Sequence, residues 1–404
     1  MLREPGLNGL SFHALRGRMG RKSVRRSWQR RTVRENRGID VMETKRVYIK
    51  DTENVRDEEL KEAALVIRMG GLVAFPTETV YGLGGNALDE DAAGKIYAAK
   101  GRPSDNPLIA HVSCAAEVEP LVKYMPESGR KLMEKFWPGP LTLIFPKSSR
   151  VPYGTTGGLD TVAVRMPSDP IANRLIALAG VPIAAPSANT SGRPSPTTAD
   201  HVWQDMNGRI DMVIDGGAVG IGVESTIVDV SGETPAVLRP GAVTMEMLRE
   251  VLGEVTIDPA ILGPVAEGVH PKAPGMKYKH YAPKAELTLV EPEMGDKKAG
   301  MTKAQIDRMV DMVKMLAKEQ IQAGQRVGII CTDESRDAYH EGIIRSIGAR
   351  QSQESVAHNL YAVLREFDDL GAEVIFSESF GEDHLGQAIM NRLSKAAGYR
   401  IVRV

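Results

Sequence analysis

The order of apolar and polar positions predicts two regions in which strands alternate with helices. In the first, Leu60, Ala63, Ala64 and Ile67 recur at helical spacing within 57–69, and an apolar strand follows at 72–75. The same reasoning predicts further strands at 47–50, 107–110, 141–145, 161–165, 183–185, 213–215, 226–230 and 237–238, and helices at 89–99, 116–136, 169–179 and 244–252. Residues 76–85 read as a polar loop at a strand end, where α/β proteins usually place ligands.

The second region begins after a proline-rich stretch at 256–285, whose five prolines and weak periodicity predict a linker. Beyond it we expect strands at 287–290, 327–331, 374–377 and 400–404, and helices at 303–323, 354–370 and 384–397. Strands that alternate with helices in this way predict a small doubly wound sheet of about five strands or fewer.

Composition narrows the class of protein. The chain has 404 residues, of which 42% are hydrophobic and 25% charged, as in ordinary globular proteins. Aromatic residues make up only 5%, which disfavours base-stacking platforms for single-stranded nucleic acid. The two cysteines, Cys114 and Cys331, are far apart and offer neither a disulfide framework nor a thiolate zinc site. With no apolar run of membrane-spanning length, we expect a cytoplasmic protein.

Charge is unevenly distributed, although the net charge is only −1. Eleven basic and three acidic residues give positions 1–40 a charge of +8, which leaves −9 for the remainder. We predict that 1–45 is a disordered basic extension or a start assigned too early, since Met42 stands directly before the first strand. The alternatives are a nucleic-acid-binding arm or an Arg-rich transit peptide.

Cationic and polar side chains follow the helix predicted at 89–99. Lys100, Arg102, Asn106 and His111 occur within a dozen residues. Alone, the two cations would suit a solvated helix end. Because a hydroxyl-rich loop containing Thr79 precedes them, we favour a site that binds a polyanion, in which an arginine fork and a compact lysine charge hold phosphate oxygens.

Several other polar residues are candidates for the site, but each has an equally good structural explanation. Arg165 shares one face of its strand with Thr161 and Ala163, so it needs an anion, which is a ligand or a buried ion-pair partner. His111 is either a hydrogen-bonded structural histidine or a group that binds a carboxylate or takes a proton from an amine. Downstream, the following residues each fit a turn or a cap equally well: Ser187, Asn189, Ser195, Ser225 and Arg239. We find no phosphate-binding-loop, Rossmann, zinc-ligand or esterase motif.

Taken in order, several short motifs carry a resemblance. They are Thr-Glu-Thr-Val-Tyr-Gly-Leu, Lys-Gly-Arg-Pro with Asn-Pro-Leu, Pro-Ser-Ala-Asn-x-Ser-Gly, Glu-Ser-Thr-Ile-Val-Asp and Arg-Pro-Gly. The chain resembles the YrdC-like family, the threonylcarbamoyl-adenylate synthases. The stretch 273–283 resembles the linker of the two-domain form, with Ala273 where serine is commoner. The resemblance implies an α/β fold of two parts: a YrdC-like twisted-sheet domain with a central cavity at 46–255, and, after the linker at 256–285, a Rossmann-like domain at 286–404.

The resemblance also implies a reaction and its site. L-threonine, bicarbonate and ATP would give threonylcarbamoyl-AMP and pyrophosphate, with Lys100 and Arg102 as the catalytic cations and Mg²⁺ carried by ATP rather than by protein ligands. The product would pass to the machinery that transfers threonylcarbamoyl to tRNA. By the family pattern threonine would be held by Thr79, His111, Arg165 and Ser225, with Arg165 on its carboxylate. ATP would be held by Lys100, Arg102, Asn106, Thr161, the main chain of Ala185, Ser187, Asn189, Ser195, Arg239 and Tyr278, with Tyr278 closing over the nucleotide.

Two other functions remain open at this point. Relatives of the fold are associated with double-stranded RNA, so the chain could be an RNA- or tRNA-binding module, or make weak RNA contacts; the charge of −9 disfavours strong phosphate-driven binding. A different carbamoyl or adenylyl transferase is the other alternative. The carbamoyl-transfer relatives carry cysteine-rich zinc fingers, which two cysteines cannot form.

Overall fold

The computed structural model describes residues 32–34, 40–261, 272–274, 280–293 and 300–404. It divides into two compact units, Met1–Glu43 and Thr44–Val404. In the first unit β1 (Thr32–Arg34) pairs antiparallel with β2 (Asp40–Met42). Of the predicted extension 1–45, residues 1–31 and 35–39 lie outside the described residues, so their disorder or mis-assigned start stays a prediction, while Lys45 already begins the next strand.

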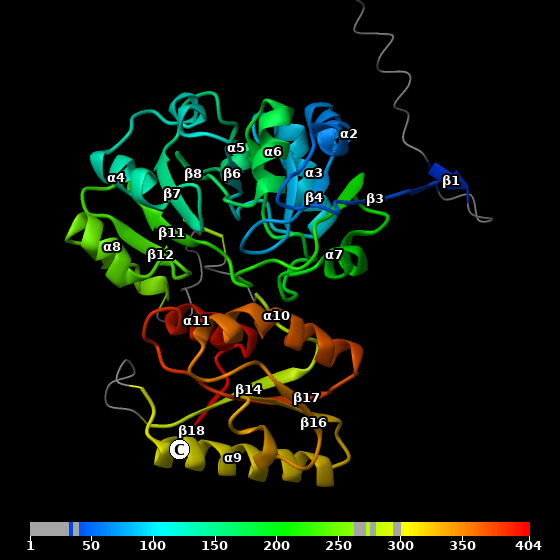
Figure 1. The fold of residues 1–404 in the computed structure, drawn as a ribbon, viewed down its shortest axis with the longest axis vertical. Helices are drawn as coiled ribbons and strands as arrows, with labels where there is room; N and C mark the ends of the chain where they lie inside the picture. Colours follow the sequence, from blue (N-terminus) through cyan, green and yellow to red (C-terminus); the bar gives the residue numbers. More distant parts are fainter. Residues whose placement is uncertain (1–31, 35–39, 262–271, 275–279, 294–299) are drawn as a thin grey trace, which may run out of the picture. The chain divides into compact units, whose positions relative to one another are not determined.

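The second unit begins with a mixed sheet of eleven strands, ordered β13-β12-β11-β7-β8-β6-β9-β5-β4-β10-β3 (Figure 1). The strands are β3 (Lys45–Tyr48), β4 (Val73–Phe75), β5 (Gly82–Asn86), β6 (Ile109–His111), β7 (Leu141–Pro146), β8 (Thr161–Arg165), β9 (Ile183–Ala184), β10 (Met212–Asp215), β11 (Thr226–Asp229), β12 (Ala236–Arg239) and β13 (Thr256–Ile257). At its centre β6 runs parallel to β8 and antiparallel to β9, and His111 lies beside Arg165 in the first of these pairs. This register brings two predicted site residues together.

Helices cover this sheet. They are α2 (Asp57–Arg68), α3 (Glu90–Lys100), α4 (Glu127–Phe136), α5 (Tyr153–Thr156), α6 (Pro170–Ala179), α7 (Ala199–Met206) and α8 (Met245–Leu252). Local sequence sets their ends: Asp169 caps α6 by accepting from the Ala172 N–H, with Pro170 at the first helical position. Apolar faces of α2 and α6 pack together over β4 through Leu60, Ile67 and Leu175. This core holds the strand ends at which the site is built.

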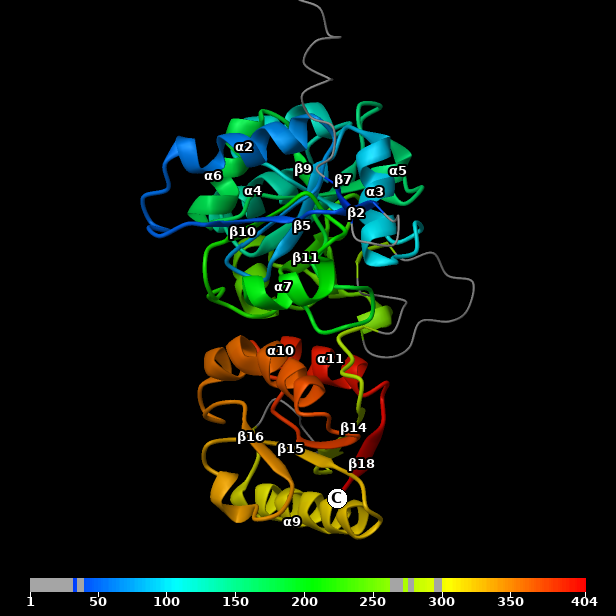
Figure 2. The ribbon, with the colours of Figure 1, turned by 90° about the vertical axis from the view of Figure 1, so that its right-hand side faces the viewer.

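A second, smaller sheet contains five strands, all parallel, in the order β16-β15-β17-β14-β18. The strands are β14 (Glu286–Glu291), β15 (Val327–Cys331), β16 (Ile343–Ser346), β17 (Val374–Glu378) and β18 (Ile401–Arg403). Helix α9 (Lys303–Gln322) covers one face, while α10 (Gln353–Asp369) and α11 (Gly386–Ala396) cover the other (Figures 1 and 2). The predicted fold class, a twisted-sheet domain followed by a smaller Rossmann-like α/β domain, is therefore confirmed.

Several predicted elements differ in detail. Residues 82–86, taken as part of a loop, form β5; an added Cβ at Gly84 would lie 2.6 Å from the Phe75 ring, so close strand packing selects glycine over the usual strand residues. The helix predicted over 116–136 forms only as α4, after two short 3₁₀ turns and Pro126. The pattern also missed α7 and β16.

Among the described residues, no helix combines the length and the apolar character that crossing a bilayer requires.

Candidate functional site

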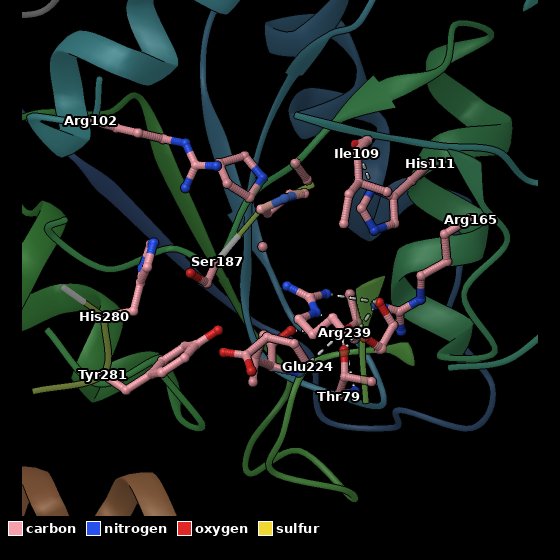
Figure 3. Close-up of a pocket in the computed structure, with 17 residues that line it drawn as sticks. Thr79, Arg102, Ile109, His111, Arg165, Ser187, Glu224, Arg239, His280 and Tyr281 are labelled. Atoms are coloured by element: carbon pink, nitrogen blue, oxygen red, sulfur yellow. Dashed lines mark hydrogen bonds between the residues drawn. The ribbon is translucent and has the colours of Figure 1, made fainter. Parts of the chain in front are cut away.

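A pocket opens where strand ends of the larger sheet meet residues of the predicted linker (Figure 3). Its walls come from the loop after β4, the loop after α3, the strands β6 and β8, the loop after β9, the approach to β11 and the end of β12. The lining residues are Thr77, Thr79, Val80, Gly82, Arg102, Ile109, His111, Arg165, Ala185, Pro186, Ser187, Glu224, Ser225, Arg239, Pro274, His280 and Tyr281. Segments more than 200 residues apart in the sequence therefore build one site.

The structure places the predicted site residues in three groups. Eight line the pocket: Thr79, Arg102, His111, Arg165, Ala185, Ser187, Ser225 and Arg239. Five are described but are not among the lining residues: Lys100, Asn106, Thr161, Asn189 and Ser195. Tyr278 lies outside the described residues.

The end of α3 positions Arg102. Gly101 terminates the helix in the left-handed conformation, with φ of 61°, which turns the chain before Arg102. The Arg102 Nε then donates to the Asn106 carbonyl at 3.3 Å, and Nη2 donates to the Pro107 carbonyl at 3.1 Å. These bonds fix one edge of the guanidinium and direct the group toward the pocket (Figure 3).

Lys100 has a different place from the one predicted. Its side chain is 2% exposed, and its ammonium donates to the carbonyls of Ser187 and Asn189. Burial lowers the pKa of Lys100 well below its usual value, and the neighbouring Arg102 lowers it further. In this structure Lys100 therefore supports the 187–189 loop from behind.

That loop is held by its own side chains as well. The Ser187 hydroxyl donates to Asn189 Oδ1 at 2.5 Å, and Asn189 Nδ2 donates to the Arg193 carbonyl at 2.9 Å. The Ser195 hydroxyl donates to Glu224 Oε1 at 2.5 Å. Asn189 thus shapes the loop, while Ser187 reaches the pocket from it.

Arg165 both lines the pocket and forms a buried ion pair, so the two alternatives left open by the sequence occur together. Its Nη1 donates to the Thr79 hydroxyl at 2.9 Å, and its Nη2 lies 2.7 Å from Glu78 Oε1. Because Nη2 carries two N–H groups, one of them can meet Glu78 while the other remains for a ligand. Burial would raise the pKa of Glu78, but Arg165 outweighs burial and lowers it. Nη2 retains the capacity to donate to a ligand carboxylate.

His111 is a neutral imidazole at physiological pH. Burial and the adjacent Arg165 lower its pKa to about 3. Its Nδ1 lies 3.1 Å from the Ile109 carbonyl, which can only accept, so we assign the proton to Nδ1 and leave the lone pair on Nε2. A base with so low a pKa removes a proton poorly. His111 is therefore suited to accepting a hydrogen bond from an amine, rather than to pairing as a cation with a carboxylate.

Buried neutral histidines make stability sensitive to mild acid. The pKa of His111 and that of His280 are lowered to about 3, in both cases mainly by burial. Such groups bind protons more readily in the unfolded chain, so the free energy of unfolding should fall as the pH drops below about 6.5, by up to roughly 1.4 kcal/mol per pH unit for each. Asp169 has the opposite effect on the free energy of unfolding below about pH 6. Burial raises its pKa to about 6, so its carboxyl binds a proton more readily in the folded protein than in the unfolded chain. Urea unfolding at pH 7, 6 and 5 measures the slope.

The control for this prediction is His111→Asn, which keeps a polar group but removes one titration. We expect its unfolding free energy to depend less steeply on pH than that of the wild type. An equal slope in both proteins would show that His111 titrates normally.

The pocket is electrostatically prepared for an anion. Burial lowers the pKa of Arg102 to about 10, and it lowers the pKa of Arg239 as well. The Arg239 Nε donates to the Ser225 carbonyl at 3.0 Å and Nη2 donates to the Ser225 hydroxyl at 3.2 Å. Desolvated cations that have been brought close together are stabilised when a polyanion binds between them.

Sequence reasoning missed four residues of the site: Glu78, Glu224, His280 and Tyr281. Glu78 and Glu224 lie inside the motifs that carry the resemblance, yet only their hydroxyl-bearing neighbours were selected. In the linker, Tyr281 lines the pocket beside His280 (Figure 3), while the role predicted for Tyr278, outside the described residues, stays a prediction. Tyr281 has φ of 66°, a left-handed conformation that is strained for a side-chain-bearing residue.

Comparisons with known proteins identify the family of this chain. Two family models match: Sua5–YciO–YrdC, described as "Telomere recombination", over 65–241, and "Threonylcarbamoyl-AMP synthase, C-terminal domain" over 243–398. A threonylcarbamoyl-AMP synthase from Pyrococcus abyssi is 47% identical over 358 residues, covering 89% of this chain and 99% of the relative. The chain belongs to the threonylcarbamoyl-AMP synthase family. A Bacillus subtilis threonylcarbamoyl-AMP synthase is 45% identical over 365 residues, and the match covers 90% of this chain and 100% of that relative.

Solved structures of the synthase family carry the same two-domain fold. The crystal structure of Pyrococcus abyssi Sua5 complexed with L-threonine has a TM-score of 0.81 and 46% identity, over 89% of this chain and 99% of that one. A variant of that protein, in which a histidine and the tyrosine after it are replaced by alanine, also gives 0.81, at 45% identity, over 89% and 98%. His280 and Tyr281 are adjacent in the same order here. The resemblance to the synthase family is thereby confirmed.

Proposed function

We propose that the pocket joins L-threonine, bicarbonate and ATP into threonylcarbamoyl-AMP and pyrophosphate, the activated carbamate used in threonylcarbamoyladenosine modification of tRNA. One observation supports this most strongly: half-buried Arg102 and buried Arg239 line the same pocket as buried Arg165. A triphosphate and an amino-acid carboxylate therefore have separate cationic partners within one enclosure.

The ATP subsite is the part lined by Arg102, Ser187 and Arg239. A guanidinium can bind two phosphate oxygens at once, which suits Arg102 and Arg239 to the triphosphate. The N–H of Ala185 already donates to the Ile109 carbonyl at 2.9 Å, so its own carbonyl would meet the nucleotide. Lys100, Asn106, Thr161, Asn189 and Ser195 would act from behind this wall or after a movement of it.

The threonine subsite is the part lined by Thr79, His111, Arg165 and Ser225. Arg165 would receive the carboxylate through the unfilled capacity of Nη2, and Thr79 is already its hydrogen-bond partner. The free lone pair that we assign to Nε2 of His111 would accept from the amine. Ser225, held by Arg239 and by Thr142 at 2.8 Å, would contact the remaining polar atoms.

ATP would enter only after part of the wall moves. The cavity between the present walls measures about 50 Å³, which is room for a few water molecules rather than for a nucleotide. His280 and Tyr281 belong to the predicted linker rather than to the sheet, so they are lining residues that could withdraw without breaking the sheet. Tyr281 would therefore close over the nucleotide together with Tyr278, the residue to which the resemblance gives this role.

The chemistry needs no covalent nucleophile from the protein. The threonine amine adds to carbon dioxide, or to bicarbonate with loss of water, and gives a carbamate. A carbamate oxygen then attacks the α-phosphorus of ATP in line; the new O–P bond forms as the bond to the pyrophosphate oxygen breaks. Positioning and stabilisation of negative charge by Arg102 and Arg239 are what the chain contributes.

Magnesium would arrive with ATP, bound through phosphate oxygens and water. Within the described residues no three His, Cys, Asp or Glu side chains gather into a metal cage. Glu224 is a carboxylate in the pocket wall, and three protein donors already occupy it. The residues present therefore fit a substrate-borne Mg·ATP complex rather than a resident metal.

The site acts on small molecules before any RNA is involved. We propose that the product passes to the tRNA threonylcarbamoyl-transfer machinery in the cytoplasm and that contacts with RNA are weak. Arg102, Arg165 and Arg239 gather inside a pocket rather than along an outer surface, so a double-stranded RNA- or tRNA-binding module is a weaker explanation of these residues.

Release of pyrophosphate, with each substrate omitted in turn, tests the proposal. We expect release to require ATP, threonine and bicarbonate together. Release that persists unchanged without threonine would indicate another nucleotide-consuming activity. Salt-sensitive binding of duplex RNA with no pyrophosphate release would instead favour the RNA-binding module.

A further inference from the structure

The smaller sheet domain reaches into the pocket wall through two side chains. Tyr361 lies on α10 and Arg392 lies on α11, and both are fully buried. Each contacts two residues that line the pocket: Glu224 from the larger sheet domain and Tyr281 from the predicted linker. We refer to Tyr361 and Arg392 as the support pair.

The support pair neutralises and orients Glu224. The Tyr361 hydroxyl donates to the carboxylate at 2.9 Å from Oε2, and Arg392 Nε donates to the same oxygen at 2.9 Å. Burial would raise the pKa of Glu224, but Arg392 and Arg239 outweigh it and lower the pKa to about 2. Oε1 of this fixed carboxylate is the acceptor of the Ser195 hydroxyl.

The same two side chains hold Tyr281. The rings of Tyr281 and Tyr361 stack with centroids 5.4 Å apart at 27°, and the Arg392 guanidinium lies 5.7 Å from the centre of the Tyr281 ring. Tyr281 keeps a left-handed backbone, which persists only where the surroundings over-determine it. The support pair supplies those surroundings.

We propose that Tyr361 and Arg392 are positioning residues of the synthase reaction: they hold Glu224 and Tyr281 in place, so that the smaller domain completes the nucleotide side of the pocket. This rests on the proposed function. The threonine side has supports that do not involve the support pair, because Thr142 bonds Ser225, and Glu78 and Thr79 hold Arg165. Removing the support pair should therefore change kcat/KM for ATP more than KM for threonine.

A double-mutant cycle in the full chain tests the proposal. Glu224→Gln and Arg392→Gln should each lower kcat/KM for ATP about tenfold, with KM for threonine changed by no more than about twofold. If the two residues act as one unit, the double variant should lose about tenfold as well, not a hundredfold. Arg392→Lys, which keeps a charge, should recover part of the loss.

Tyr361→Phe is the second variant, for the case that Arg392→Gln does not fold. It keeps the ring that stacks on Tyr281 and removes only the donor to Glu224, so kcat/KM for ATP should fall severalfold without loss of Tm. The matched control is Arg345→Gln, which removes an exposed partner of Glu366 within the same domain and should leave the kinetics unchanged.

The outcomes separate this inference from the proposed function. A wild type without threonine-dependent pyrophosphate release contradicts the function itself. An active wild type whose support-pair variants keep kcat/KM for ATP, or whose double variant loses the product of the two single losses, overturns only the inference. A loss that falls equally on ATP and threonine would mean general disturbance of the fold, and would overturn it too.

Discussion

Replacing Arg102 by alanine should lower pyrophosphate release by on the order of a hundredfold or more. Arg102 lines the pocket, and its guanidinium is oriented by the carbonyls of Asn106 and Pro107 before any ligand binds. A preorganised, desolvated charge of this kind stabilises the transition state more than it stabilises bound substrate, so kcat should carry most of the loss. Initial rates at saturating threonine and bicarbonate measure it.

Two further variants separate the role of the Arg102 guanidinium from that of a positive charge alone and from support of the neighbouring loop. Arg102→Lys keeps the charge but not the two-pronged geometry, so it should retain an intermediate rate. Lys100→Ala should also be slow, but for another reason: it removes the ammonium that holds the Ser187 and Asn189 carbonyls, so its Tm should fall with the activity. If Arg102→Ala kept near-normal kcat, the assignment of Arg102 to the reacting phosphates would be wrong.

Arg165→Ala should raise KM for threonine by at least about thirtyfold, with a smaller effect on ATP. Truncating one partner of a buried, hydrogen-bonded charge pair costs about 2–5 kcal/mol, and about 2 kcal/mol already corresponds to that factor. The same change leaves Glu78 buried without its counter-ion, which should lower the free energy of unfolding by about 3–5 kcal/mol.

The double variant Arg165→Ala/Glu78→Gln separates binding from stability. Removing the orphaned carboxylate charge should restore much of the lost stability, while threonine binding stays weak because the carboxylate receptor is still absent. Recovery of threonine KM together with stability would contradict the account, since it would mean that Arg165 acts only through the fold.

Hydrophobic periodicity was enough to predict most of the sheet and helix framework. It failed where other constraints govern the backbone. Three of the five β5 residues are glycine, and at Gly84 the Phe75 and Ile183 side chains leave no space for a Cβ, so the composition of this strand resembles that of a loop. The helix expected across 116–136 is interrupted near Pro120 and Pro126, a local effect that periodicity does not register.

The sequence motifs predicted which segments form the site, but not which side chains contact one another within it. The sequence indicated that Arg165 needs an anion, but only the fold shows Glu78 as the partner already in place. Their shared positive charge suggested that Lys100 and Arg102 act alike. The helix ends in a turn at Gly101, however, so Lys100 lies behind the 187–189 loop and Arg102 lines the pocket. The links from Glu224 to Arg392 and from Tyr281 to Tyr361 join segments too distant in the sequence for any local pattern to reveal.

Calorimetric titration of the Arg102→Ala and Arg165→Ala variants with each substrate tests the central claim most directly, namely that one pocket holds two separate anion receptors. Arg102→Ala should bind ATP at least about thirtyfold more weakly and threonine almost normally, whereas Arg165→Ala should show the reverse. Equal weakening of both ligands in both variants, or no change in either, would contradict it.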